Sequence, residues 1–395
     1  MKTLLVDLTS LDTPSRRRGF GRYVHDLALG LSRLQREELG DLRLLGLTRL
    51  EYNGDYRLTE QLDSFEGSSE IVLPTPRDHY HWAYARRLAL FRVVKKIGAD
   101  AVHLGDAHAT PLFMGHTHCR RIVTCHDAIP MHFPKLYMGW RDGGPLLGAA
   151  IERRRYRTAD LVVAISDATL NDVLTIHGVP RERVVRVYNG VDVDRWSSEP
   201  SLDPQQTLNQ LGLKNHGFAL FVGGYHWHKN VEGMLAGVAW ARQQGVDISL
   251  VWAGQLSDSQ QAHIRSVAEQ VGAADALKLL GYVTDEQVAV LYRCAVAHVL
   301  LSRFEGFGLT IIEAMASGCP VMTTRAGSLA EIAGEAALTV DPEDHAAIGS
   351  GLSRLATDAT YRAELSERGR AQAPRFSLDV QARAMATVYR NFLQV

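Results

Sequence analysis

The sequence has few cysteines, no long apolar run and almost no net charge. Only four of its 395 residues are cysteine, and no two are paired as C-x-x-C, so a disulfide framework or a structural zinc site is disfavoured. No apolar run approaches the roughly 20 residues that span a bilayer, and no secretory signal opens the chain. Basic and acidic residues number 43 and 44, which argues against a nucleic-acid partner. We expect a cytoplasmic protein with free thiols.

The apolar residues, 46% of the chain, are arranged as short runs separated by helical patterns. This alternation predicts parallel sheets covered by helices on both faces, and the length suits two domains. A helix is predicted to begin at the glycine pair Gly19 and Gly21. Strands are predicted in the first half at Leu4–Leu8, Leu42–Leu47, Ala101–Leu104, Arg121–Cys125, Leu161–Ile165 and Val184–Tyr188.

A polar stretch at residues 189–217 predicts a linker, after which the alternation starts again. Strands are then predicted at Phe218–Val222, Ile248–Ala253, Leu277–Leu280, His298–Leu301 and Val321–Thr323, and helices at Lys229–Gln243, Ser259–Gln270 and Leu309–Ser317. The expected fold class is therefore α/β, with two Rossmann-like, doubly wound parallel-sheet domains. In such sheets ligands bind beyond the carboxyl ends of the strands.

The segment that carries most chemistry is FEGFGLTIIEAMASGCPV, residues 304–321. Its glycines permit a tight turn before a helix. The free amides of the first helical turn would face an anion such as a diphosphate; they belong to Gly308, Leu309 and Thr310. Glu313, one turn further, is placed to accept hydrogen bonds from a ribose, and Glu305 precedes the helix, where it would touch a sugar. The alternative is that both glutamates are ordinary loop and helix residues.

Glu305 and Glu313 form an E-x7-E arrangement, and with EGFGLTIIEAMASGCPV it resembles the signature of the family 4 glycosyltransferases. The resemblance implies the GT-B fold, in which two Rossmann-like domains face a cleft, and transfer with retention of the anomeric configuration. It also implies an N-terminal acceptor domain of residues 1–192 and a donor domain of residues 193–376. A C-terminal helix, residues 377–395, would return to the first domain.

The same resemblance assigns the donor-binding residues. It implies that Lys229 neutralises the donor diphosphate, while Glu305 holds the sugar and Glu313 the ribose. It places the rest of the sugar nucleotide against a set of mostly glycine-rich loops, formed by Gly19, Gly21, Gly223, Gly224, Val283, Gly306, Phe307, Gly308, Leu309 and Thr310.

On the N-terminal side, His126 follows a predicted strand and resembles the family's histidine at the reaction centre. Asp127 and Ser166 also follow strand ends and are auxiliary candidates near the acceptor. Other histidines occur between residues 101 and 130, but no ligand pair there has the matched spacing of a zinc finger.

The sequence departs from the family at one cation. Many members carry an arginine close to the lysine, where this chain has Gly224 and His228. The side chains that would replace it are His228, Arg303 and Arg22. Asp192-Val193-Asp194 spells D-x-D but lies in the hinge, so we expect no metal and no other cofactor. Lys229 and the helix dipole would stabilise the leaving group in place of Mg²⁺.

The stretch WAYARRLALFRVVKK, residues 82–96, is basic and amphipathic. One interpretation is an ordinary surface helix. The other is a patch that contacts an anionic membrane or a lipid-linked acceptor, extended by the arginines at 153, 154, 155 and 157.

The resulting hypothesis is a retaining hexosyltransferase of surface-polysaccharide synthesis. Its acceptor would be a glycan or a lipid-linked glycan. The stretch CHDAIP, residues 125–130, looks like bacterial mannosyltransferases, which favours GDP-mannose as donor; a UDP-sugar is the alternative. A sugar-nucleotide epimerase and a non-catalytic nucleotide-sugar binder of the same fold are the remaining alternatives.

Overall fold

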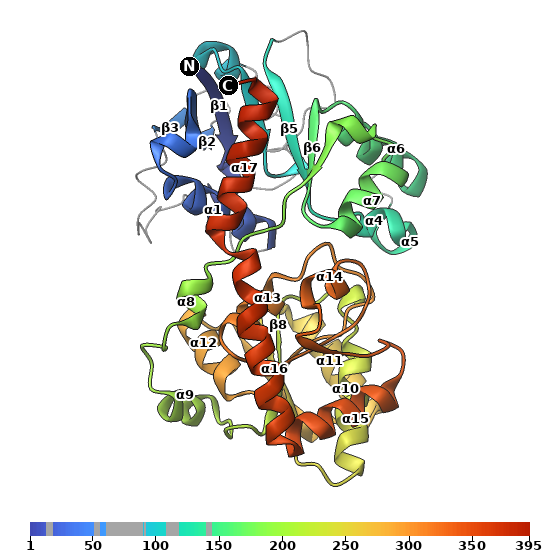
Figure 1. Cartoon of the computed structure of the whole chain (residues 1–395). Coiled ribbons are helices and arrows are strands. Elements are labelled where there is room, and N and C mark those ends of the chain that lie inside the picture. Colours follow the sequence, from blue (N-terminus) through green and yellow to red (C-terminus); the bar gives the residue numbers. More distant parts are fainter. Residues whose placement is uncertain (13–18, 51–55, 61–89, 91, 108–117, 140–143) are drawn as a thin grey trace. The chain divides into compact units, whose positions relative to one another are not determined.

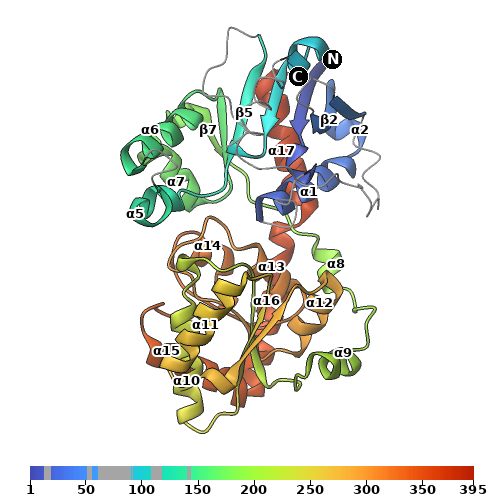
Figure 2. The ribbon, with the colours of Figure 1, turned by 180° about the vertical axis from the view of Figure 1, so that it is seen from behind.

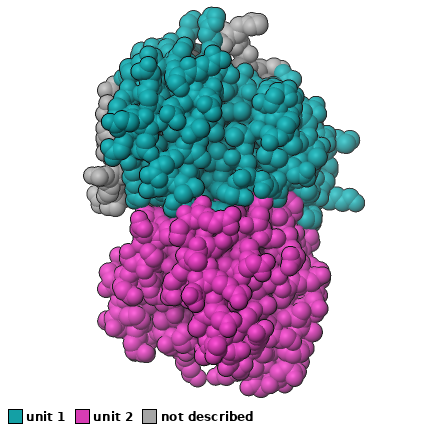
Figure 3. All heavy atoms as spheres, in the orientation of Figure 1, with its two compact units in different colours: residues 1–191, 376–395 teal, residues 192–375 magenta. Residues whose placement is uncertain are grey.

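The computed structural model describes residues 1–12, 19–50, 56–60, 90, 92–107, 118–139 and 144–395. The chain forms two compact units, one of residues 1–191 and 376–395 and the other of residues 192–375 (Figure 3). The division falls one residue from the expected boundaries, and the C-terminal segment belongs to the first unit.

The first unit is built on a seven-stranded sheet of order β3-β2-β1-β4-β5-β6-β7, parallel except for β3. Its strands are β1 Lys2–Asp7, β2 Leu42–Leu50, β3 Tyr56–Glu60, β4 Ala101–Leu104, β5 Arg120–Cys125, β6 Leu161–Ala164 and β7 Val184–Arg186. The buried runs of β1, β4, β5 and β6 form the core, because a parallel strand is covered on both faces.

Helices cover this sheet. They are α1 Gly19–Ser32, α2 Arg36–Leu39, α4 Ile129–His132, α5 Pro134–Tyr137, α6 Gly144–Arg157, α7 Asp167–Thr175 and the C-terminal α17 Leu378–Leu393. Helix α17 packs against α1 (Figure 1). The buried ring of His103 bridges Tyr389 of α17 and Thr124 of β5, with nitrogen–oxygen distances of 2.7 and 2.8 Å. This polar contact fixes where the C-terminal helix lies on the sheet.

The second unit is built on a six-stranded, all-parallel sheet of order β10-β9-β8-β11-β12-β13. The strands are β8 Phe218–Val222, β9 Ser249–Ala253, β10 Leu277–Gly281, β11 Ala297–Leu300, β12 Val321–Thr323 and β13 Ala337–Thr339. The sequence predicted all of these except β13, which is only three residues long.

The helices of the second unit lie on both sides of its sheet. Figures 1 and 2 show α10, α11 and α15 gathered on one side and α8, α9 and α12 on the other. The bounds are α8 Val193–Ser197, α9 Pro204–Leu211, α10 Val231–Gln243, α11 Asp258–Gln270, α12 Asp285–Cys294, α13 Leu309–Ala316, α14 Leu329–Ala333, α15 His345–Thr357 and α16 Ala359–Gln372.

The predicted linker at 189–217 is wrong as a description of structure, because it contains α8 and α9. Asp192 and Asp203 cap these helices by accepting from the amides of Arg195 and Gln206 at 3.2 and 2.6 Å. Trp196 of α8 is buried. Capping aspartates and a few buried side chains hold these short helices: Trp196 on α8, and Thr207 and Leu208 on α9. A hydrophobic period of 3.6 is not visible over so few residues.

The amphipathic stretch 82–96 lies largely outside the described residues. In the part that is described, Leu90, Val93 and Val94 are buried in the core of the first unit, while Arg92 and Lys95 are exposed. The apolar side of that part therefore faces the protein and not a membrane. In the described part of the chain, no helix is long and apolar enough to cross a bilayer.

Candidate functional site

A buried ion pair joins the two loops on which the sequence concentrates its chemistry in the second unit. Lys229 ends a 3-10 turn, η7 (Trp227–Lys229), that follows β8, and Glu305 follows β11. Lys229 Nζ lies 2.6 Å from Glu305 Oε1, and the Ser302 hydroxyl donates to the same oxygen at 2.6 Å. The Lys229 and Glu305 side chains are 20% and 10% exposed, so the pair is largely withdrawn from solvent.

The Glu305 carboxyl is held in its ionised form. Burial by itself raises its pKa, but the charge of Lys229 and the hydrogen bonds from Lys229 and Ser302 outweigh burial, so the pKa lies below its ordinary value of 4.5. Removing one member of such a pair leaves an uncompensated buried charge. Lys229 therefore keeps Glu305 ionised, and the contact holds both side chains in place.

The loop that carries Glu305 is fastened to the loop after β12. The Ser328 amide donates to the Glu305 carbonyl at 3.1 Å, and the Ser328 hydroxyl donates to the Phe307 carbonyl at 2.9 Å. Gly327, at φ +60°, lies so close that a Cβ there would stand 2.3 Å from the Glu305 carbonyl oxygen. Only glycine fits this approach, so the two loops form one rigid surface.

Helix α13 starts without a side-chain cap. Its N-cap is Gly308, at φ 105° and ψ 53°, whereas α11 and α12 are capped by the hydroxyls of Ser257 and Thr284. The first amides of a helix need acceptors, and an anion supplies them with the help of the helix dipole. The structure therefore leaves the first turn of α13, shortly after Glu305, suited to a phosphate.

His298 ties that first turn to the sheet. Its Nδ1 donates to the Leu220 carbonyl at 3.0 Å, so the neutral ring accepts from the Thr310 hydroxyl at Nε2, 3.1 Å away. Burial lowers the pKa of His298 to about 3, so the ring stays neutral. Sequence reasoning missed this residue, because a histidine inside a buried strand gives no local signal of its partner.

Glu313 lies on the same helix, one turn beyond its start. It is 6% exposed, and the Tyr292 hydroxyl donates to its Oε2 at 3.3 Å. A carboxylate on an otherwise apolar, buried helix needs such partners. The arrangement holds the carboxylate in one orientation.

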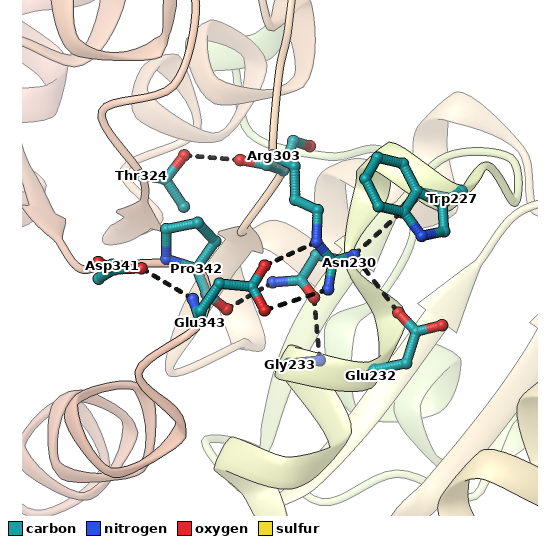
Figure 4. A network of polar contacts seen from close by, with 10 residues as sticks. Trp227, Asn230, Glu232, Gly233, Arg303, Thr324, Asp341, Pro342 and Glu343 are labelled. Atoms are coloured by element: carbon teal, nitrogen blue, oxygen red, sulfur yellow. Dashed lines mark hydrogen bonds and ion pairs between the residues drawn. The ribbon is translucent and has the colours of Figure 1, made fainter. Parts of the chain in front are cut away.

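Arg303 is engaged in a local network (Figure 4). Its Nε donates to Glu343 at 2.7 Å, its Nη1 to the Trp227 carbonyl at 3.2 Å, and its guanidinium lies 4.8 Å from the centre of the Trp227 ring. Glu232 adds a second carboxylate at 3.6 Å. The Arg303 amide also donates to the His228 carbonyl at 2.7 Å. Arg303 thus holds the Lys229 loop in place and is already engaged by two carboxylates, those of Glu343 and Glu232.

His228 does not replace the missing arginine. It is 6% exposed, and burial lowers its pKa to about 4, so the ring carries no charge at neutral pH. Arg22 lies on α1 of the first unit, 3.7 Å from Asp26. Of the three side chains expected to replace the missing arginine, His228 is therefore neutral, and Arg303 and Arg22 already have acidic neighbours.

Arg325 is a candidate that sequence reasoning missed. It is exposed, on the loop after β12 that is fastened to Glu305, and within the described residues no side chain or carbonyl pairs with its guanidinium. The available signal was its position directly after the strand VMTT, where ligands of parallel sheets bind.

The loops after β8, β9 and β10 approach one another at three glycines. The Gly223 amide donates to the Ala253 carbonyl at 3.0 Å, and the Gly254 amide to the Gly281 carbonyl at 2.8 Å. The Trp252 indole donates to the Gly223 carbonyl at 2.9 Å. We call Gly223, Gly254 and Gly281 the floor. Of the neighbouring residues, Gly224 is exposed and Val283 is half-buried. Backbone contacts thus tie the ends of these three strands together.

In the first unit, His126 follows β5 as predicted. Its Nε2 lies 2.6 Å from the Gly105 carbonyl, so that nitrogen donates. The edge of its ring also meets the ring of Tyr23, with centroids 4.8 Å apart. His126 is only partly buried. The imidazole is therefore held in one orientation at the carboxyl end of the sheet.

The other candidates in the first unit have structural roles. Asp127 accepts from the Ile129 amide at 2.9 Å and starts α4. Ser166 is fully buried and caps α7 by accepting from the Thr169 amide at 3.0 Å. Gly19 and Gly21 belong to the first turn of α1, where the sequence predicts that a helix begins. No described group of three or more acidic, histidine or cysteine side chains is arranged to hold a metal.

The two-unit fold and this set of loops define a GT-B glycosyltransferase. Residues 205–372 match the model of glycosyl transferases group 1, and residues 17–195 match that of glycosyltransferase family 4. The chain therefore belongs to the family 4 glycosyltransferases.

The chain is similar to proteins of several specificities. It is 28% identical over 275 residues to the O-antigen chain mannosyltransferase B of Escherichia coli, covering 68% of this chain and 70% of the relative. It is 30% identical over 202 residues to the mannosylfructose-phosphate synthase of Agrobacterium fabrum, but covers only 49% of this chain and 44% of that protein. Its fold matches Anabaena Alr3699/HepE in complex with UDP-glucose, with a TM-score of 0.74, 17% identity, and 99% and 100% of the two chains covered.

Proposed function

We propose that this glycosyltransferase moves a hexose from a nucleoside diphosphate to a glycan or lipid-linked acceptor, with retention of configuration. The observation that carries the proposal is the Lys229–Glu305 ion pair, which lies just before the uncapped first turn of α13. A lysine cation next to free helix amides is suited to a diphosphate leaving group.

The donor diphosphate would lie between Lys229 and the amides of Gly308, Leu309 and Thr310. Arg325 would supply the second cation, since it is exposed on the loop that is fastened to Glu305. In this assignment Arg303 supports the site without touching the donor. The charges of the chain would then stabilise the leaving group without a metal ion.

The two glutamates would bind the two ends of the sugar nucleotide. Glu305 would accept from sugar hydroxyls while it remains paired with Lys229, and Glu313 would accept from the ribose diol. The floor formed by Gly223, Gly254 and Gly281 would lie against the base. His126 of the first unit would contact the sugar or the acceptor hydroxyl.

In the transfer step, the bond from the anomeric carbon to the diphosphate oxygen breaks and its electron pair leaves with the diphosphate. The acceptor oxygen bonds to the same face of that carbon, and its proton passes to the departing diphosphate. Lys229, Arg325 and the α13 amides would act by stabilising the charge that develops on the leaving group.

GDP-mannose is the favoured donor. Two relatives named for mannosyl transfer support it, as does the CHDAIP stretch around His126. A UDP-sugar is the second candidate, because a protein of the same fold binds UDP-glucose.

A donor panel tests the proposal. Thermal shifts with GDP, UDP, ADP and their sugars should show the largest stabilisation with GDP-mannose, since a bound ligand stabilises the native state.

Donor consumption is then measured with and without a glycan acceptor, and with a chelator. Acceptor-dependent release of the nucleotide supports transfer. A changed donor sugar with no acceptor would indicate an epimerase, and binding without turnover a non-catalytic binder. Loss of activity with the chelator would contradict the metal-free mechanism.

A further inference from the structure

Three leucines on two adjoining helices of the first unit, α5 and α6, are exposed. Leu136 is 56% exposed, and Leu146 and Leu147 at the start of α6 are 90% and 55% exposed. Helix α5 packs against α6, and Figures 1 and 2 show both helices beside the β6–β7 edge of the sheet. Single exposed leucines are ordinary, but a cluster on two adjoining helices marks an interaction surface.

Basic side chains lie on the same two helices as these leucines. Lys135 precedes Leu136 on α5, and Arg153, Arg154 and Arg157 are exposed on α6. Leu146, Ala150, Arg153 and Arg157 follow one another at helical spacing, so one face of α6 is apolar at its start and basic at its end. We call Lys135, Leu136, Leu146, Leu147, Arg153 and Arg154 the α5–α6 face.

The orientation of α6 is fixed by its inner side. Gly148 and Tyr156 are buried, and the Tyr156 ring packs on the ring of His177 with centroids 4.4 Å apart. Glu152, the acidic residue of α6, pairs with Arg155. The helix therefore cannot turn its leucines inward without exposing Tyr156. Arg153 and Arg157 donate to the Ile176 and His177 carbonyls at 3.0 and 2.8 Å, and these neutral acceptors do not cancel the positive charge of the helix.

We propose that the α5–α6 face docks on an anionic lipid surface. Leucines would enter the boundary between head groups and acyl chains, while the arginines and Lys135 would meet lipid phosphates. A second copy of the chain fits less well, because a two-fold contact would bring the cations of one copy against those of the other. The charge on the two helices thus selects an anionic partner.

The position of this face suits a lipid-linked acceptor, a point that rests on the proposed function. Helix α5 follows His126 in the chain with only α4 between them. Asp127 Oδ1 accepts from the amide of Ile129, the first residue of α4, at 2.9 Å. A bilayer bound at α5 would therefore lie close to the histidine proposed to meet the acceptor.

Vesicle binding of the full chain tests the proposal. Sedimentation with equimolar phosphatidylglycerol and phosphatidylcholine should show binding that weakens with salt, and pure phosphatidylcholine should bind far less. Arg153→Gln with Arg154→Gln should weaken binding to the anionic vesicles by about 30-fold, or about fivefold per cation. The double variant Leu146→Ser with Leu147→Ser should weaken binding to both kinds of vesicle by at least about tenfold.

Matched variants control for charge and apolarity. Arg265→Gln with Arg368→Gln removes two exposed arginines from the second unit, and Val380→Ser removes an apolar side chain that is 46% exposed. Both should bind vesicles like the unaltered chain. Equal binding by the α5–α6 variants, or a change in oligomeric state in place of vesicle binding, would overturn the proposal. Donor binding is measured separately by thermal shift, so failure of the proposed function is told apart from failure of docking.

Discussion

Lys229 and Glu305, 76 residues apart in sequence, form a 2.6 Å ion pair at the carboxyl ends of β8 and β11. The pair brings together the two side chains that the proposed mechanism assigns to the leaving group and to the sugar. Because replacing either one leaves the other as an uncompensated buried charge, each replacement affects both catalysis and stability.

Lys229→Ala should lower kcat by about 10²- to 10³-fold, because it removes a charge that acts mainly on the departing diphosphate. Lys214→Ala, at an exposed site of the same unit, is the control and should leave kcat unchanged. Steady-state kinetics with saturating donor measure the effect. An equal loss in both variants would rule out a specific role for Lys229.

Glu313→Ala should raise the donor KM by roughly tenfold or more, as expected for a lost hydrogen bond to a charged group. The exposed Glu269, on α11, provides the control variant Glu269→Ala. Donor titrations with the nucleoside diphosphate and with the nucleoside base alone separate the two parts of the ligand. If Glu313→Ala leaves the KM unchanged, the carboxylate does not hold the ribose.

Arg325→Gln should weaken binding of the donor by about tenfold with little change in stability, because the side chain is exposed and has no hydrogen-bond or ion-pair partner in the described part of the chain. Arg265→Gln, another exposed arginine of the unit, should leave the affinity unchanged. The affinity for the nucleoside diphosphate, compared with that for the monophosphate, is the measurement. We expect Arg325→Gln to weaken the affinity for the diphosphate more than that for the monophosphate. If the ratio of the two affinities is unchanged, Arg325 does not bind the diphosphate.

His298 should make the protein sensitive to acid. Its folded pKa of about 3 lies below the ordinary 6.5, so as pH falls the unfolded chain takes up a proton first. The contribution of His298 to the free energy of unfolding is fully present above pH 6.5. It is lost as the pH falls from there towards the pKa of the folded state. The midpoint of thermal unfolding in His298→Gln should therefore vary less steeply with pH over this range. Parallel curves for the two proteins would contradict the buried, neutral ring.

Much of the fold was predictable because parallel, doubly covered strands appear as short apolar runs. Ala101–Leu104, Phe218–Val222 and Val321–Thr323 have the bounds that the sequence predicts. Strands β3 and β13 and helices α8 and α9 are among the elements that were not predicted, since elements of three to eight residues are too short to show a clear hydrophobic period.

The sequence by itself determined the family, two α/β sheets, and which residues of the segment 304–321 are candidates for the site, because glycines and glutamates at fixed spacing are local properties of the chain. Only the tertiary structure paired Lys229 with Glu305, made His228 neutral, engaged Arg303 with Glu343 and left Arg325 exposed. These outcomes depend on burial and on contacts between loops from different strands. The charge of a side chain, and which partner neutralises it, are set by that environment.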